Sequence, residues 1–207
     1  MSVSPALSEI GRLIRGRRSV RRFHSEPVPS SADLENLLAL ATWAPSAHNR
    51  QPWRLVVLRD AVAKERLAQR MGDRLRTERT ADGADPADVE ADARRSHTRL
   101  TQAPVIIVLC LTVEEMDRYP DPRRVQAERT MAVQSTAMAG QNLMLAAHAA
   151  GWGSCWMCAP LFAPEEVRSA LDLPEAWEPQ GAIVLGAPIG EVPPRPRRGL
   201  SEVVRWM

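Results

Sequence analysis

Apolar residues recur at helical spacing through the first part of the chain. We predict a short helix over residues 6–18, because its apolar residues share one face: Leu7, Ile10, Leu13 and Ile14. A second helix is predicted from about Ser31, with Ser30 or Ser31 as its N-cap, and it should end before Pro45. The apolar face of this second helix carries Leu34, Leu37, Leu38 and Ala41.

Three short, continuous apolar runs predict buried β-strands, at residues 53–58, 104–111 and 180–186. The longest helical pattern covers residues 126–150 and ends at Gly151 in the C′ position. Its apolar residues spread around much of the circumference near residues 143–147, which indicates burial on more than one side. Because the same helix carries the small residues Ala132, Ser135 and Ala139, we expect dimerisation through it. Strands separated by long helical stretches predict a three-layer α+β or α/β domain.

Two segments lack a strong apolar period. Residues 64–99 are polar and charged, with a turn-like run at residues 81–86, and we interpret them as a surface excursion over the core that sets substrate choice. Residues 191–198 are rich in proline, which predicts an extended connector instead of a helix. Residues 200–206 alternate weakly and could cover a neighbouring element.

The composition is ordinary for a soluble globular protein, and we expect one domain over residues 1–207. Lys and Arg total 27 against 25 Asp and Glu, and this near-neutral balance argues against a dedicated nucleic-acid binder. No apolar run approaches the ~20 residues that cross a bilayer, and no secretory pattern opens the sequence. We therefore expect a cytoplasmic protein without a membrane partner.

Arginines cluster near both ends of the chain. Four of them fall within six residues, Arg17, Arg18, Arg21 and Arg22, together with the hydroxyl of Ser19. A planar guanidinium binds phosphate through two parallel charge-assisted hydrogen bonds. A second cluster, Arg195, Arg197 and Arg198, could converge with the first on a single phosphate. The alternative interpretation is that both clusters are solvated basic segments.

Two further segments are candidates for contact with a flat ligand. Residues 44–53 (APSAHNRQPW) hold Asn49 and Gln51 in a proline-bounded loop, and their amides offer donors and acceptors to the edge of a heterocycle. Residues 151–160 follow the long helix, and Gly151 and Gly153 permit close approach of the backbone to a ligand. The alternative for this second segment is a helix-to-strand turn with packed tryptophans.

Cysteines and histidines give no pattern for metal or nucleophilic chemistry. Cys155 and Cys158 form a C-x-x-C, but neither a redox context nor a second pair of zinc ligands accompanies them, so we interpret them as buried structural cysteines. The four histidines are dispersed, and only His48, beside the amides, is a candidate for substrate contact. We therefore expect no metal site. The glycine-rich motifs of Rossmann and P-loop enzymes are absent from the sequence.

Three ordered motifs resemble those of the nitroreductase family of FMN-dependent oxidoreductases. RRSVRRF resembles the family's R-x-S-x-R-x-F, APSAHNRQPW resembles its A-P-S-x-x-N-x-Q-P-W, and the Pro-rich end with Arg195 and Arg197 resembles its C-terminal phosphate contacts. The resemblance covers essentially the whole chain. GWGSCWMCAPLFAPEEVRSALDLP and WEPQGAIVLG further resemble the C-terminal FMN domain of the bifunctional enzyme that glutamylates the deazaflavin coenzyme of actinobacteria. The ligase part of that enzyme does not occur in this sequence, so glutamylation is not implied.

The resemblance implies roles for individual residues. Those expected to hold the FMN phosphate and ribityl chain are Arg17, Arg18, Ser19 and Arg21, with Arg195 and Arg197 closing on the phosphate. Those expected to reach the flavin from the second subunit of a homodimer are Pro45, Ser46, Asn49 and Gln51. A backbone segment is expected to run beside the N5 edge of the flavin ring, and it consists of Cys158, Ala159, Pro160 and Leu161.

The resemblance also implies a fold and an activity. The fold would be a three-layer α/β/α domain of the α+β class with a mostly antiparallel sheet, in a domain-exchanged homodimer. The activity would be hydride transfer by bound FMN, from NADH, NADPH or a reduced deazaflavin, to a small-molecule acceptor such as a dehydro deazaflavin precursor or a nitro or enone compound. No catalytic side chain is implied, since the flavin N5 carries the hydride. A flavin destructase or dehalogenase on the same scaffold, and a non-catalytic flavin or deazaflavin-binding protein, stay open as alternatives.

Overall fold

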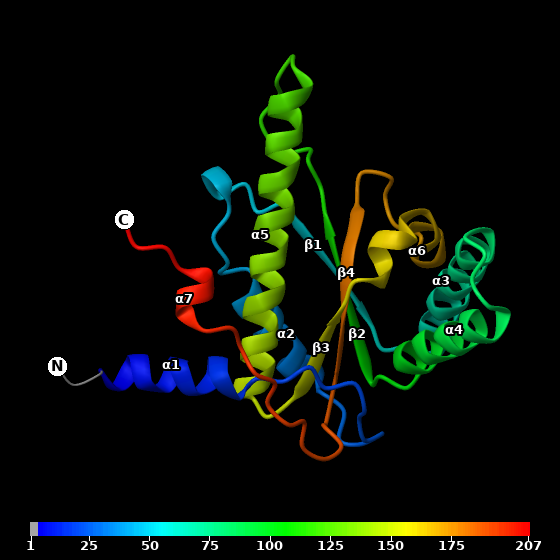
Figure 1. Cartoon of the computed structure of the whole chain (residues 1–207), viewed down its shortest axis with the longest axis horizontal. Helices are drawn as coiled ribbons and strands as arrows, with labels where there is room; N and C mark the ends of the chain where they lie inside the picture. The colour runs from blue at the N-terminus through cyan, green and yellow to red at the C-terminus, as the bar shows by residue number, and fades with distance from the viewer. Residues whose placement is uncertain (1–3) are drawn as a thin grey trace.

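A four-stranded antiparallel sheet forms the centre of the protein in the computed structural model, which describes residues 4–207 (Figure 1). Its strands are β1 (Trp53–Leu58), β2 (Val105–Leu111), β3 (Gly153–Met157) and β4 (Glu178–Gly186). The order is β1-β2-β4-β3, so β1 and β3 are the edge strands. Every residue of β2 is buried, which explains its unbroken apolar sequence. The mostly antiparallel sheet expected from the resemblance is confirmed.

Helices cover both faces of the sheet and complete the expected three layers. On one face lie α2 (Ser31–Ala41) and α5 (Pro122–Ala149), packed on a core that includes Leu37, Ile107 and Leu143. On the other face lie α3 (Ala61–Ala81), α4 (Pro86–Thr101) and α6 (Pro164–Leu171), packed on a core that includes Leu67, Leu100 and Val167 (Figure 1). The exposed helix α1 (Pro5–Gly16) and the short helix α7 (Leu200–Val203) flank this body.

The interpretation of residues 64–99 as a surface excursion was wrong. They form most of the hairpin of α3 and α4, which packs directly on the sheet and buries Leu67, Met71 and Leu100. Few large apolar residues suffice because Ala68 and Ala93 are also buried, and these small side chains let the helices approach closely. The mean hydropathy of residues 64–99 is therefore low although the two helices carry a continuous, narrow apolar stripe.

Several element boundaries also differ from the prediction. Helix α5 begins at Pro122 instead of residue 126, because Asp121 caps it by accepting a hydrogen bond from the backbone N–H of Arg124. Strand β3 and helix α6 were not predicted. The Ser30 cap of α2 is confirmed: its hydroxyl accepts from the Asp33 N–H, and the Asp33 carboxylate accepts from the Ser30 N–H.

The indole of Trp156 fixes β3 against both α5 and β4. A Cβ atom added at Gly181 would lie 2.6 Å from Trp156 Cε2 and Cζ2, and one added at Gly140 would lie 2.4 Å from Trp156 Cζ3. Both glycines therefore make room for this ring. Since Trp156 comes two residues before Cys158, the ring also sets the position of the turn that follows β3.

We predict that Gly181→Ala destabilises the protein by about 1–3 kcal/mol, because the new methyl group must displace a packed indole. Urea denaturation of both forms measures the difference in the free energy of unfolding. Gly72→Ala is the matched control, since its Cβ would meet only the flexible end of Arg76, and a helical glycine gains stability on replacement by alanine. Equal stability of the Gly181 and Gly72 variants would contradict the prediction.

Candidate cofactor site

The two arginine clusters lie in one pocket although they come from opposite ends of the chain. One wall is the segment after α1, with Arg17, Arg18, Ser19 and Arg21, and the other is the C-terminal arm (residues 187–207), with Val192, Pro193, Arg195 and Arg197. The pocket has a volume of about 390 Å³. We refer to it as the arginine pocket.

The guanidinium charges of the arginine pocket are not neutralised by carboxylates. Within residues 4–207, Arg17, Arg21 and Arg197 form no ion pair, and the same holds for Arg18 and Arg195. Their hydrogen bonds go to carbonyl oxygens instead: Arg18 Nη1 donates to the carbonyls of Arg15 and Arg17, and Arg197 Nη1 donates to those of Arg195 and Pro196. Several like charges held together without a counterion make this pocket attractive to a multivalent anion.

Backbone hydrogen bonds to the edge of the sheet hold the first wall. Ser19 lies opposite Ser154 in a parallel bridge, and the Val20 N–H donates to the Ser154 carbonyl at 2.9 Å. The C-terminal arm begins beside the same segment, where the His24 N–H donates to the Ala187 carbonyl and the Ile189 N–H donates to the Arg22 carbonyl. These contacts bring the two ends of the chain together at the start of β3.

The outer edge of β3 leads from the arginine pocket to the predicted flavin segment. Apart from the Ser154 bridge, β3 pairs only with β4 among residues 4–207, so the outer edge at residues 155–157 has unpaired backbone groups. The strand runs into the turn η2 (Ala159–Phe162), preceded by Cys158. Pro160 is buried, whereas Leu161 and Cys158 are exposed. The interpretation of Cys158 as a buried cysteine was wrong, because β3 ends just before it and leaves its side chain outside the core.

A further arginine, not singled out from the sequence, acts on the charge of a thiol in β3. Burial raises the pKa of the Cys155 thiol, while the charges of Arg21, Arg99 and Arg17 act to lower it. Arg99 lies in the last turn of α4. The two helices α3 and α4 are rich in arginines, and half of these form ion pairs with carboxylates on the same two helices, so the sequence does not single out Arg99.

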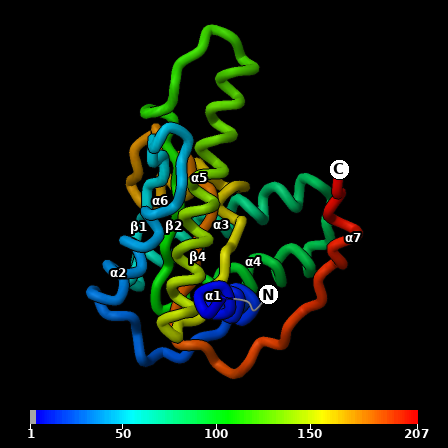
Figure 2. The backbone as a smooth tube through the Cα atoms, turned by 90° about the vertical axis from the view of Figure 1, so that its left-hand side faces the viewer, coloured from blue at the N-terminus to red at the C-terminus, as the bar shows by residue number. Residues whose placement is uncertain are grey.

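The loop at residues 45–51, here named the amide loop, lies away from the arginine pocket of its own chain (Figures 1 and 2). It joins α2 to β1, and Arg50 forms an ion pair with Asp117 at 2.5 Å beside the start of α5. Pro45, Asn49 and Gln51 are exposed, and Ser46 Oγ accepts from the Gln51 N–H at 3.0 Å. The structure therefore does not bring the amides and the arginines together within one chain.

The amide loop holds three residues in the left-handed backbone region, which is costly for side chains other than glycine. These are His48, Asn49 and Gln51, with φ of 50°, 54° and 50°. Each such residue costs on the order of 1 kcal/mol or more, and strain of this kind concentrates where a ligand or partner is recognised. The exposed indole of Trp43 lies just before the loop, with 83% of its surface accessible.

The other two cysteines lie inside the core of the protein. Cys110 and Cys155 are buried free thiols, and burial raises the pKa of Cys110 to about 12. Across residues 4–207, no three His, Cys, Asp or Glu side chains are placed to hold a metal ion. No helix in that range is both long and apolar enough to span a bilayer.

The sequence is similar to those of known proteins over most of its length. The profile described as the Nitroreductase family matches residues 14–187. The chain is 31% identical over 214 residues to an NADH dehydrogenase of Thermus thermophilus, covering 92% of each protein. It is 32% identical over 186 residues to a 5,6-dimethylbenzimidazole synthase of Rhodospirillum rubrum, covering 87% of this chain and 82% of that protein.

Solved structures share the fold. A structure from Desulfovibrio desulfuricans, described as a nitroreductase in complex with FMN, aligns with a TM-score of 0.72 at 26% identity and covers 100% of this chain and 98% of that one. A BluB-like flavoprotein from Clostridium difficile aligns with a TM-score of 0.80 at 22% identity, covering 96% and 98% of the two chains.

Proposed function

The chain belongs to the nitroreductase family, and we propose on this basis that it is an FMN-dependent oxidoreductase that passes hydride from NADH or NADPH to a small-molecule acceptor. One observation supports this proposal most directly. The arginine pocket gathers guanidinium groups without carboxylate partners at the start of an unpaired strand edge, where a phosphate and a flat ring could be held together. The similarity to a structure solved with FMN supports this assignment of the ligand.

The residues of the pocket fit FMN in charge and in hydrogen-bonding groups. Arg17, Arg21 and Arg197 would hold the phosphate through charge-assisted hydrogen bonds, and Ser19 would bind the ribityl chain. The outer edge of β3 and the backbone at residues 158–161 would line the polar edge of the ring. FMN would supply hydride transfer at its N5 atom. The positive charges of Arg21 and Arg99 would stabilise negative charge developing at this edge.

We propose that the complete site needs two copies of the chain. The amide loop lies away from the arginine pocket, so it can contact a flavin only in another subunit (Figure 2). Large apolar residues also stay exposed on α1, α5 and the C-terminal arm, and burial in a homodimer would remove them from water. They are Leu7, Ile10, Ile14, Val125, Met138, Leu200, Val203 and Trp206.

For the acceptor we propose a compound related to the deazaflavin coenzyme. This rests on the resemblance of residues 151–174 and 177–186 to the FMN domain of the deazaflavin-glutamylating enzyme. A reduced deazaflavin could replace nicotinamide as the donor, and a nitro or enone compound could replace the dehydro precursor as the acceptor. Monitoring deazaflavin fluorescence with the FMN-loaded protein tests this point, and absence of any change would leave nitro and enone acceptors as the class to screen.

A flavin destructase is the second candidate function, favoured by the similarity to a 5,6-dimethylbenzimidazole synthase. The ring of that product carries the same two neighbouring methyl groups as the benzenoid ring of a flavin. Incubation of the protein with reduced FMN and oxygen, followed by chromatography for 5,6-dimethylbenzimidazole, separates the two candidates. Formation of the product would favour the destructase, and recovery of intact FMN with turnover of NADH would favour the oxidoreductase.

The proposed function is tested by flavin content and nicotinamide oxidation. We expect the purified protein to contain FMN or to bind it when added, and to oxidise NADH or NADPH in the presence of an acceptor. A protein that binds no FMN would contradict the proposal. Binding without any turnover would indicate a non-catalytic flavin-binding protein.

We predict that His148 makes FMN bind more tightly as the pH falls, by up to a few-fold. Half-buried His148 lines a cavity with Arg17 and Arg18. Burial, and then the charges of Arg17, Arg12 and Arg18, hold the pKa of His148 below its usual 6.5. A bound phosphate would offset these charges and raise the pKa of His148, so FMN binding takes up a proton and acid favours it.

Fluorescence titration of FMN at several pH values measures this dependence. His148→Gln should flatten the pH profile, whereas His97→Gln should not, because His97 lies on α4 and bonds to Glu65 instead. In the FMN-free protein the sign reverses: the protonated imidazole is disfavoured in the fold, so the free energy of unfolding should decrease as the pH falls below 6.5. A pH profile unchanged in His148→Gln would contradict the assignment.

A further inference from the structure

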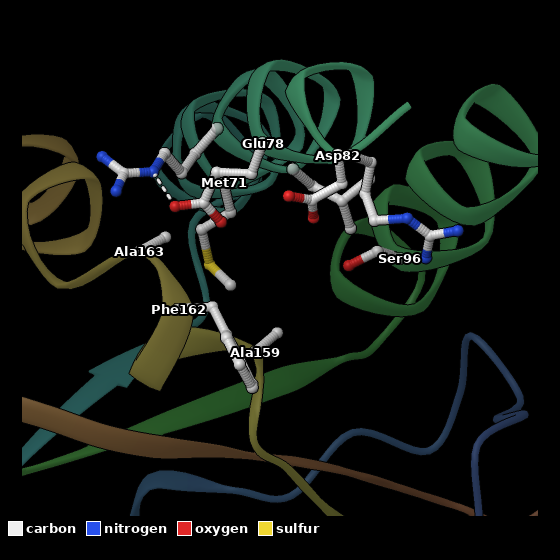
Figure 3. A pocket seen from close by; sticks show the side chains of 10 residues that line it. Met71, Glu78, Asp82, Ser96, Ala159, Phe162 and Ala163 are labelled. Carbon is white, nitrogen blue, oxygen red and sulfur yellow. Dashed lines mark hydrogen bonds and ion pairs between the residues drawn. The ribbon is translucent and has the colours of Figure 1, made fainter. Parts of the chain in front are cut away.

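A further cavity opens between the hairpin of α3 and α4 and the η2 turn (Figure 3). Its volume is about 270 Å³, close to the lower end of the ~300–1,000 Å³ typical of small-molecule sites, so it suits a compound of one or two rings. It shares Ala159 with the backbone segment at residues 158–161. The cavity therefore adjoins the place where the reacting edge of the flavin is proposed to lie.

One part of the wall of this cavity is apolar. Met71, Leu75 and Phe162 line it, together with the small residues Ala159 and Ala163. Figure 3 shows the thioether of Met71 directed towards Phe162 and Ala159. Phe162 is 70% exposed although it faces the cavity, so an aromatic ligand would cover a phenyl ring that water now contacts. Methionine adapts readily to such rings.

The polar rim of the cavity disfavours anions because its guanidinium groups are already paired. Arg74 donates from Nε to Glu78 at 2.6 Å and from Nη1 to Glu166 at 3.2 Å. Arg79 pairs with Asp92 at 3.1 Å, and Arg95 pairs with the same carboxylate. Asp82 on the rim forms no ion pair with any residue in the range 4–207. The rim thus retains one uncompensated carboxylate and no uncompensated guanidinium.

We propose that, for a nitro or enone acceptor, this cavity binds the non-reacting part of the molecule, as a small aromatic group that is uncharged or cationic. Its ring would pack on Met71 and Phe162, and a donor substituent such as an amine would face Asp82 and Ser96, which Figure 3 shows on the side of the cavity opposite Ala163. Its role as an acceptor subsite rests on the proposed function, whereas its ligand preference rests on the cavity alone. This preference is opposite in charge to that of the arginine pocket.

Equilibrium dialysis with three probes of equal size tests the proposal: 4-nitrobenzylamine, 4-nitrobenzyl alcohol and 4-nitrobenzoate. It is carried out on FMN-free and FMN-loaded protein without a hydride donor, so that binding is measured apart from turnover. We expect the amine and the alcohol to bind, and the benzoate to bind at least about tenfold more weakly because it faces Asp82. Benzoate binding as tight as that of the amine would overturn the charge preference.

Variants locate the binding in this cavity. Asp82→Asn should reduce the amine affinity to that of the alcohol, whereas Asp73→Asn should not, because Asp73 pairs with Arg76 and lies outside the cavity. Ser96→Trp should fill the space and weaken all three probes about tenfold or more. If that variant does not fold, Phe162→Ala, which removes an exposed ring, should weaken the two binding probes about tenfold. Unchanged binding in a folded Ser96→Trp or Phe162→Ala protein would overturn the proposal.

Failure of this inference can be told apart from failure of the proposed function. FMN uptake by each variant is measured in parallel, and substitutions in the cavity should leave it unchanged. Wild-type protein that takes up no FMN would contradict the proposed function, yet dialysis of the FMN-free protein would still decide whether the cavity binds the probes. In the FMN-loaded enzyme, Asp82→Asn should raise KM for the amine and leave kcat within about twofold, as expected when only ground-state binding is lost.

Discussion

Arg17→Ala and Arg197→Ala should each weaken FMN binding by roughly 10- to 150-fold, because a hydrogen bond between charged groups contributes about 1.5–3 kcal/mol. The two guanidinium groups belong to opposite walls of the arginine pocket, and neither forms an ion pair with any residue in the range 4–207 that could compensate for its absence. Removing either one therefore leaves a phosphate with fewer partners. Fluorescence titration of FMN against the flavin-free proteins measures the change.

Riboflavin distinguishes a phosphate contact from a general loss of structure. It has the same ring and ribityl chain as FMN but no phosphate, so its affinity should change little in either variant. Arg205→Ala is the matched control within the C-terminal arm, since Arg205 is exposed and lies outside the arginine pocket. Equal weakening of FMN and riboflavin, or unchanged FMN affinity in both variants, would show that these arginines do not bind the phosphate.

Strands could be predicted where the sequence carries a continuous apolar run, as in the fully buried β2 and in β1, whose four central residues are half-buried. β1 was predicted at its observed bounds and β2 within one residue, because continuous apolar runs of this length mark buried strands. β3 also pairs with a buried strand on one side. However, it begins with Gly153 and Ser154 and its outer edge is free, so its sequence resembles that of a turn. β3 is a strand because it pairs with β4, which lies about twenty-five residues later in the chain. Its conformation is therefore not a property of its local sequence.

The candidate site was predictable in its charges but not in its geometry. Two unbalanced arginine clusters can be found by inspection, whereas the contacts that bring them together run through the backbone of Ser154 and Ala187. Arg99 could not be found in this way, because only the tertiary structure separates it from the ion-paired arginines of the same hairpin. The left-handed backbone at Gln51 is equally hidden, since glutamine does not signal positive φ, whereas His48 and Asn49 belong to residue types enriched in that region.

Two defective variants should restore each other's flavin sites when their subunits are mixed. One chain carries Arg17→Ala and Arg197→Ala, and the other carries Asn49→Ala and Gln51→Ala. Each mixed dimer then has one site with intact arginines from one subunit and an intact amide loop from its partner. With random exchange, half of the dimers are mixed, so about a quarter of the wild-type FMN capacity should return. FMN bound per chain after exchange, against the two variants kept apart, measures this recovery.

A second mixture excludes the alternative in which each site is built within one chain. All four substitutions are placed on a single chain, which is then mixed with the wild type. If sites are shared between subunits, both sites of a mixed dimer are damaged, and about a quarter of the capacity is again expected, from wild-type dimers alone. If each chain built its own site, the first mixture would recover nothing and the second would retain about half. The amide loop and the arginine pocket lie apart in the chain (Figures 1 and 2), so we expect the two mixtures to give the same result.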